Sequence, residues 1–164
     1  MSYDGETLTS CGALNLDFST VAVVAVSGDG INGCGHCILA VGSSAGSTYF
    51  HVAGRNSNPK YMSQAGYSRY LVESKKTEWK RIRIQLPNPT AAFAKLEELL
   101  SKPWLWLVLP NNCVAFVEEV IAAGGATWSS GSNCPAIAVT DSSDIGRLFN
   151  MMEASIYYAY GVPR

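Results

Sequence analysis

Two runs of sequence decide the fold, His36-Cys-Ile-Leu-Ala-Val-Gly42 and Thr48-Tyr-Phe-His-Val-Ala53. Each run is mostly apolar and has the length of a strand, and the residues that connect them are mostly glycine and serine. Two such runs around a Gly/Ser-rich connection are typical of a β-hairpin. We therefore expect two adjacent antiparallel strands here, with the rest of the domain built around them.

Other strands and helices are expected on both sides of this hairpin. A β-branched run ended by glycine indicates a buried strand over 21–27, and apolar–polar alternation indicates a half-buried strand over 79–86. An amphipathic helix capped by Thr90 is expected over 91–100. The remaining expected elements are a polar segment over 54–78 with a flap or a short helix, a strand over 104–109, a helix over 113–123, a strand over 136–139 and a last helix to about residue 157. This mixture predicts one α+β domain spanning residues 1–164.

The composition of the chain narrows the classes of protein it can belong to. Of its 164 residues 48% are hydrophobic and 15% are charged, which is typical of a globular protein. A net charge of −1 gives no reason to expect nucleic acid as a partner. No run is long and apolar enough to span a bilayer, so we expect no integral membrane segment. The first residues lack the basic and apolar regions of a secretory signal, so we expect no signal peptide.

The number of cysteines limits their pairing. The chain has five, Cys11, Cys34, Cys37, Cys113 and Cys134. Because five is odd, at least one thiol is free or paired with another chain. Disulfides among the other four depend on the redox compartment, and the spacing does not say which would pair.

Cys113 falls where a helix is expected to begin. Asn111 and Asn112 are good cap residues, the apolar periodicity continues to Ala123, and Gly124 ends it. The backbone N–H groups and the positive dipole end of such a helix stabilise a thiolate. The sequence therefore predicts a nucleophilic cysteine, while a small apolar core residue is the alternative interpretation.

The two histidines of the chain, His36 and His51, lie on the two arms of the expected hairpin. If the turn is centred near residues 43–44, they lie directly opposite each other on one face. If the register of the two strands shifts by two residues, the histidines become diagonal neighbours that still share one face. Two adjacent imidazoles can serve as a general base and the group that orients it, as in a nucleophilic triad.

Three segments together resemble one family: His36-Cys-Ile-Leu-Ala-Val-Gly42, Tyr49-Phe-His51-Val-Ala53 and Asn112-Cys113-Val-Ala-Phe116-Val117. The family is the circularly permuted NlpC-type papain-like cysteine hydrolases, which include the lecithin retinol acyltransferase-like proteins. The resemblance covers under a third of the chain and implies an antiparallel sheet packed against helices. It also implies that Cys113 is the nucleophile, His36 the base and His51 the orienting residue. Unlike the family pattern, the hairpin connection is longer, and an apolar pair follows the cysteine.

Cys34-Gly-His-Cys37 supports a different interpretation, because it matches the dithiol motif of thioredoxin-like oxidoreductases. That motif needs its first cysteine at a helix start, whereas Ile38–Gly42 is strand-like. We expect no metal, because adjacent residues of a strand point to opposite faces and no second pair of ligands follows. No cofactor is expected either. A catalytically idle binding module, with the three candidate residues apart in space, is the remaining alternative.

The family resemblance implies substrates with acyl or amide bonds. The chain is small, lacks a signal and is rich in Gly, Ser and Ala, which fits an antibacterial type VI secretion effector. We therefore expect a peptidoglycan amidase or endopeptidase, made in the bacterial cytoplasm, active in a target-cell periplasm and blocked by an immunity protein. A phospholipid acyl hydrolase or acyltransferase is the nearest alternative. Asn112, Trp104 and Trp106 are candidates to contact the substrate.

Overall fold

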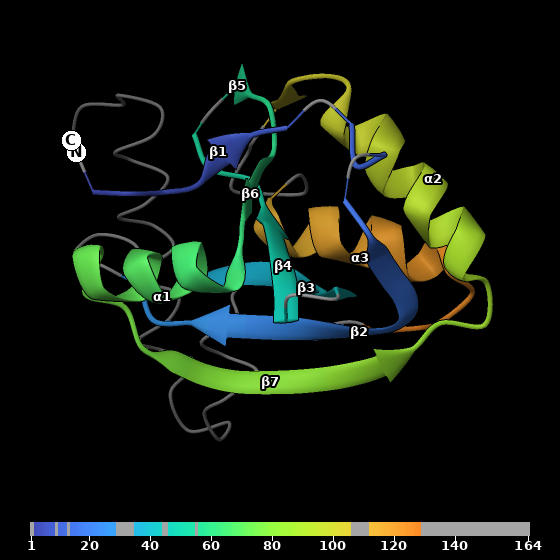
Figure 1. Ribbon diagram of the computed structural model, residues 1–164, viewed down its shortest axis with the longest axis horizontal. Helices are drawn as coiled ribbons and strands as arrows, with labels where there is room; N and C mark the ends of the chain where they lie inside the picture. The colour runs from blue at the N-terminus through green and yellow to red at the C-terminus, as the bar shows by residue number, and fades with distance from the viewer. Residues whose placement is uncertain are drawn as a thin grey trace, which may run out of the picture.

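The computed structural model of the chain describes residues 2–8, 10–12, 14–28, 35–43, 46–54, 56–105 and 112–128. These residues form an α+β structure, as the sequence predicts, with a six-stranded antiparallel sheet and helices on both of its faces (Figure 1). The strands of this sheet are β1 (Glu6–Thr7), β2 (Leu16–Val26), β3 (His36–Ser43), β4 (Gly46–His51), β6 (Lys60–Met62) and β7 (Glu78–Gln85), in the spatial order β1-β6-β4-β3-β2-β7. The helices are α1 (Gln64–Glu73), α2 (Pro89–Leu100) and α3 (Cys113–Ala123).

The longest strand, β2, lies inside the sheet and pairs with β3 on one side and with the edge strand β7 on the other. Its β-branched run is mostly buried, as expected for a strand that has a neighbour on each side. The strand begins at Leu16, earlier than the expected run, and its pairing with β3 shifts between Asp17 and Val21. β7 alternates between exposed and half-buried residues, as its sequence predicts.

The expected hairpin is β3 and β4, but its pairing is shifted by two from the predicted one. Ser43 pairs with Gly46 and Leu39 with Phe50. Continued by one residue, this register sets His51 beside Ile38, so the histidines are diagonal neighbours and not directly opposite. Since side chains on a strand alternate with a period of two, both still share one face.

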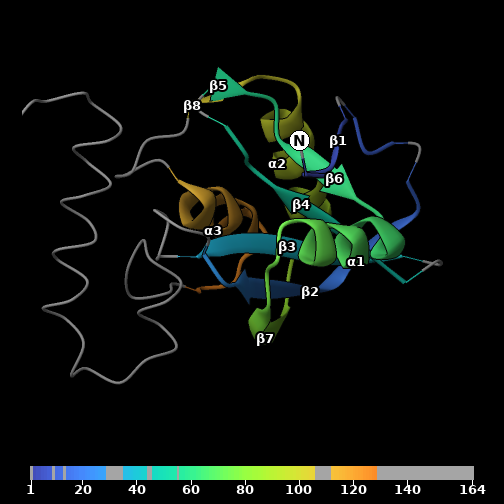
Figure 2. The same cartoon turned by 90° about the vertical axis from the view of Figure 1, so that its left-hand side faces the viewer.

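Two apolar layers cover the two faces of β3. Cys37, Leu39 and Val41 pack with α2 and α3 in the larger core cluster. Ile38 and Ala40 pack in a second cluster, together with two tyrosines of α1. Figure 2 shows α3 and α1 on opposite sides of β3. The α3 side and the α1 side of the sheet are named after these helices below.

The polar segment over 54–78 holds more structure than its sequence suggests. It forms β5 (Asn56–Ser57), β6 and the helix α1, whose N-cap is Ser63. β5 pairs with β8 (Trp104–Leu105) in a separate two-stranded sheet. The expected continuation of β8 to residue 109 lies outside the described residues, as do the elements expected over 136–157.

The cap expected at Thr90 is wrong. α2 begins at Pro89, and the side chain of Asn88 accepts a hydrogen bond from the amide of Ala91 at 3.1 Å. Proline is favoured at the first helical position because its missing N–H would be unpaired there. Asn88 is therefore the cap, two residues earlier than expected.

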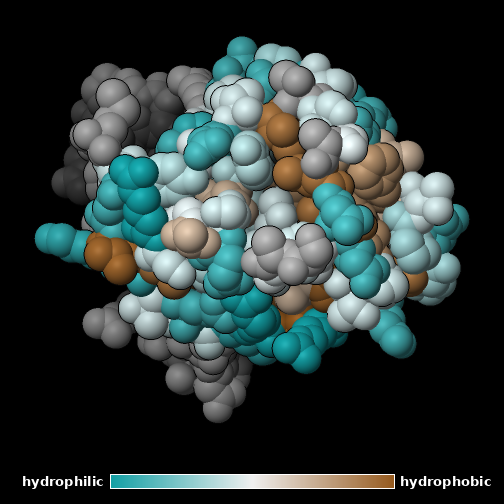
Figure 3. All heavy atoms as spheres, viewed as in Figure 1, coloured by the Kyte–Doolittle hydropathy of each residue, from teal (hydrophilic) through white to brown (hydrophobic). Residues whose placement is uncertain are grey.

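The described surface is mixed in hydropathy. On the face of Figure 3 hydrophilic side chains predominate, and hydrophobic ones gather beside α2 and the chain that follows β1. Among the described residues, no helix has the length and apolar character needed to cross a membrane.

Candidate active site

Cys113 is the first residue of α3, held there by the cap residue before it. The Oδ1 atom of Asn112 accepts hydrogen bonds from the amides of Val114 at 2.9 Å and Ala115 at 3.2 Å. Asn112 is 2% exposed and Cys113 is 5% exposed. The side-chain oxygen of Asn112 is thus used in capping, and this residue has almost no surface with which to contact a substrate.

The thiol of Cys113 lies against the first peptide of β3. Its Sγ atom accepts a hydrogen bond from the backbone N–H of Cys37 at 3.4 Å. This nitrogen belongs to the peptide that joins His36 to Cys37, so standard bond lengths place the sulfur within about 6 Å of the His36 Cα. The helix start and the strand start therefore meet at His36.

Burial dominates the acidity of this thiol. Backbone N–H groups of Cys37, Cys113 and Val114 lower the pKa of Cys113, but burial raises it more, to about 11. The expectation that the helix start makes Cys113 a thiolate is therefore wrong for this resting arrangement. At neutral pH the group is a neutral thiol that needs a base.

His36 and His51 are in direct contact. The Nε2 atom of His36 lies 2.7 Å from the Nδ1 atom of His51, and the two rings meet edge to face. The other nitrogen of His51, Nε2, lies 2.8 Å from the carbonyl oxygen of Asp4. These contacts form a linear chain from a backbone carbonyl through two imidazoles.

The direction of this chain follows from the chemistry of its last member. A carbonyl oxygen only accepts hydrogen bonds, so the Nε2 atom of His51 carries a proton and donates it to Asp4. In the neutral ring the Nδ1 atom of His51 then carries a lone pair and accepts from the Nε2–H of His36. The lone pair of neutral His36 is thereby placed on its Nδ1 atom, the position that a general base needs.

Both imidazoles are neutral at neutral pH. Burial lowers the pKa of His51 to about 4, although the carbonyl and the carboxylate of Asp4 oppose this shift. Burial and the neighbouring His51 lower the pKa of His36 well below its usual value. The tautomers assigned above are therefore those of the resting protein.

The thiol and the imidazoles approach β3 from its two sides. His51 contacts Tyr70 of α1, with 5.7 Å between ring centroids, whereas Cys113 belongs to the cluster on the α3 side. Among the described residues, no hydrogen bond joins the sulfur to either ring. The pairing of β3 with β4 ends at Leu39 and Phe50. Since β4 does not pair with β3 beyond this point, the two sides meet at the start of β3.

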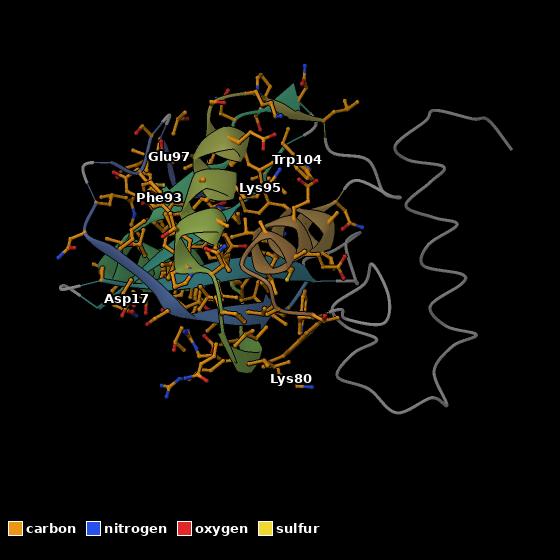
Figure 4. All side chains as sticks on the ribbon, turned by 90° about the vertical axis from the view of Figure 1, so that its right-hand side faces the viewer. Asp17, Lys80, Phe93, Lys95, Glu97 and Trp104 are labelled. Atoms are coloured by element: carbon orange, nitrogen blue, oxygen red, sulfur yellow. The ribbon has the colours of Figure 1, made fainter. Side chains whose placement is uncertain are left out.

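Trp104 is a core residue. It is 6% exposed and lies edge to face with Phe116 at 5.6 Å, between α2 and α3 (Figure 4). Its Nε1 atom has no hydrogen-bond partner among the described residues. It therefore offers almost no surface to a substrate. Trp106, the other expected aromatic contact, lies outside the described residues.

The dithiol motif is described only in part. Cys37 is 1% exposed, lies in a strand, and has a pKa raised well above the usual value by burial. This differs from the helix start on which a thioredoxin-type motif depends. Cys34 and Cys134 lie outside the described residues, and the described Cys11, Cys37 and Cys113 are free thiols. No group of three or more metal-binding side chains occurs in the described part of the chain.

Two members of the site are backbone groups that the sequence analysis did not find. They are the carbonyl of Asp4 and the N–H of Cys37. A backbone group carries no residue-type signal, so only the fold reveals it. A glycine directly after Asp4 is the one local hint, since glycine permits turns that other residues avoid.

Comparison of the chain with protein-family models, with curated proteins and with solved structures found no significant match.

Proposed function

We propose that this protein is a cysteine hydrolase in which Cys113 attacks an acyl carbon, His36 is the general base and His51 orients it. The observation that carries the proposal is the hydrogen-bond chain from Asp4 through His51 to His36. It leaves a lone pair on the His36 Nδ1 atom, on the residue whose peptide the thiol of Cys113 touches. A nucleophile, a base and an orienting group are the parts that covalent acyl transfer needs.

The reaction starts with a proton transfer. Because the pKa of Cys113 is about 11, its proton has to pass to the His36 Nδ1 atom as the sulfur attacks the carbonyl carbon. The mechanism requires that the Sγ atom of Cys113 and the Nδ1 atom of His36 come within hydrogen-bond reach at the start of β3 when the substrate binds. Catalytic hydrogen bonds are often long before the substrate binds, and tighten with it.

Two half-reactions complete the cycle. The imidazolium of His36 returns its proton to the leaving amine or alcohol, and a thioester on Cys113 remains. Water then loses a proton to His36 and adds to the thioester, and the sulfur leaves with that proton as a thiol. Backbone N–H groups that bond the sulfur at rest, those of Cys37 and Cys113 itself, are candidates to stabilise the oxyanion.

The fold we propose is the papain-like one of the permuted NlpC type, and the substrate is an amide or peptide bond of peptidoglycan. The support is the resemblance of the three site segments to that family, together with a helix that begins at Cys113 and packs on the strand that begins at His36. An antibacterial effector of a type VI system, with a matching immunity protein, is the biological role that this substrate implies.

The test compares two cysteine variants. Wild type, Cys113→Ala and Cys11→Ala are incubated with purified muropeptides and with phospholipid vesicles, and products are followed by mass spectrometry. Cys11 is a matched control because it is also a buried free thiol, whose pKa burial and Glu97 raise to about 12.

The expected result is muropeptide cleavage that Cys113→Ala reduces by at least about a thousandfold and that Cys11→Ala retains. Cleavage of phospholipid only, lost in Cys113→Ala, would contradict peptidoglycan as the substrate and support the lipid hydrolase. Activity that survives in Cys113→Ala would contradict the nucleophile itself.

A further inference from the structure

The segment 2–8 is anchored to the rest of the molecule by specific contacts. β1 pairs with β6, with Glu6 opposite Tyr61 and Thr7 opposite Lys60. The carboxylate of Asp4 forms an ion pair with Lys60 at 2.6 Å. The amide of Tyr3 donates to Glu73 of α1 at 2.7 Å. The segment is therefore fixed on both sides of Asp4.

Gly5 sets the direction of the Asp4 carbonyl. Its φ is +100°, a conformation that residues with a Cβ rarely adopt. A Cβ atom at this position would also lie 2.9 Å from the carbonyl oxygen of Tyr61. Both facts reserve this position for glycine, and they do so one residue after the carbonyl that accepts from His51.

We propose that the segment 2–8 is a positioning element of the active site, and that its Asp4 carbonyl selects the tautomers of His51 and His36. This inference rests on the proposed roles of Cys113 and His36. Asp4 and Gly5 touch no substrate in this scheme, and act only through His51.

The consequence of losing the carbonyl follows from the hydrogen-bond chain. Without an acceptor at Nε2, His51 can carry its proton on Nδ1 instead. The Nε2 atom of His36 must then accept that proton's hydrogen bond, and the proton of His36 moves to its Nδ1 atom. His36 no longer has a lone pair for the proton of Cys113. One displaced carbonyl thus removes the base without changing any catalytic side chain.

The variants separate the carbonyl of Asp4 from its carboxylate. Gly5→Ala keeps both side chains of the ion pair but displaces the peptide after Asp4. Asp4→Asn keeps the carbonyl and removes only the charge on the side chain. Gly12→Ala is the matched control, because a Cβ at Gly12 meets only the Ser10 hydroxyl, at an ordinary 3.5 Å.

The primary readout is the ¹⁵N NMR spectrum of the imidazole nitrogens in the full chain at neutral pH, which distinguishes protonated from unprotonated ring nitrogens. The chain has two histidines, so four ring signals are expected. In wild type, Asp4→Asn and Gly12→Ala, both rings should be protonated at Nε2 only. In Gly5→Ala the Nδ1–H tautomer should become populated in both rings.

The second readout is hydrolysis of the substrate identified for the wild type. A wrong histidine tautomer in a serine hydrolase triad lowers kcat by about 10⁴. We expect Gly5→Ala to lower kcat by at least about tenfold, with KM little changed and Gly12→Ala like wild type.

Each outcome decides for or against the proposal. A wild-type His51 that is unprotonated at Nε2 overturns it, whether or not Gly5→Ala folds. A folded Gly5→Ala with wild-type tautomers overturns it as well. If the tautomers shift as expected while the wild type hydrolyses none of the substrates tried, the positioning of the histidines is supported and the proposed hydrolase function is what fails.

Discussion

Cys113 combines two opposing environments within a single residue. Three backbone N–H groups favour its thiolate, yet burial leaves its pKa at about 11. His36 does not supply the missing stabilisation at rest, since burial and His51 keep it neutral. The resting site is thus a neutral thiol near a neutral base, and not a thiolate–imidazolium pair.

This state predicts a steep pH dependence of alkylation. Only the thiolate reacts with iodoacetamide, so with a pKa of about 11 the rate at Cys113 should rise about tenfold per pH unit from pH 7 to 10. Peptide mapping by mass spectrometry measures this rate, with Cys113→Ala as the blank. A rate that is already constant near pH 7 would show a preformed ion pair and contradict the prediction.

The residue types in the sequence predict which side chains form this site better than they predict the protonation states of those side chains. The sequence alone indicates a cysteine at a helix start and two histidines on one hairpin. In the structure the two histidine rings are in contact. Burial is not visible locally, because it depends on α1, α3 and the sheet together. The pKa of Cys113 therefore shifts in the direction opposite to the one that the helix start alone predicts.

At the scale of elements, prediction succeeds where caps and turns are unambiguous. α3 covers Cys113–Ala123 as expected, since Asn112 caps it and two glycines follow it. The hairpin register is shifted because its connection is a run of small residues without a single favoured turn. α1 is not specified from sequence because its hydrophobic stripe is weak, so Ser63 and tertiary packing determine it.

The cap of α3 should matter for function as well as for stability. Replacing Asn112 by Ala removes the acceptor of two helix amides, which should lower the free energy of unfolding by about 1–2 kcal/mol. Because Cys113 is the next residue, the alkylation rate of its thiol should also change. Urea unfolding and the alkylation rate at a fixed pH check the two effects.

The matched control is Asn88→Ala, which removes the equivalent cap of α2. It should cost a similar free energy of unfolding, about 1 kcal/mol, and leave the reactivity of Cys113 unchanged. Equal effects of both variants on alkylation would show that Asn112 acts only through overall stability. Asn112→Asp keeps a capping oxygen and should restore most of the stability.

At the scale of the molecule, the site depends on segments that are far apart in the chain. Asp4 and His51 are 47 positions apart, and Cys37 and Cys113 are 76 positions apart. Local pattern cannot predict such contacts, since they exist only once the sheet has brought β1, β3 and α3 together. For this reason the sequence alone does not predict that the segment 2–8 takes part in the site.

The buried His51 and the half-buried His36 link this site to the stability of the whole molecule. His51 has a pKa of about 4 when folded and about 6.5 when exposed. Between these values the unfolded chain binds a proton that the folded chain does not, so the free energy of unfolding must fall as the pH falls. The slope is about 1.4 kcal/mol per pH unit for one proton. Urea titrations between pH 7 and 5 measure it, above the range in which carboxylates titrate.

The variant His36→Gln/His51→Gln isolates this effect. It removes both imidazoles, so its free energy of unfolding should change little from pH 7 to 5, even if it is lower throughout. A wild type that is equally stable at both pH values would mean that the rings are charged or accessible in the folded state. The neutral tautomers, and with them the lone pair on the His36 Nδ1 atom, would then be wrong. The acid sensitivity of the whole fold is in this way a test of the protonation state at its active site.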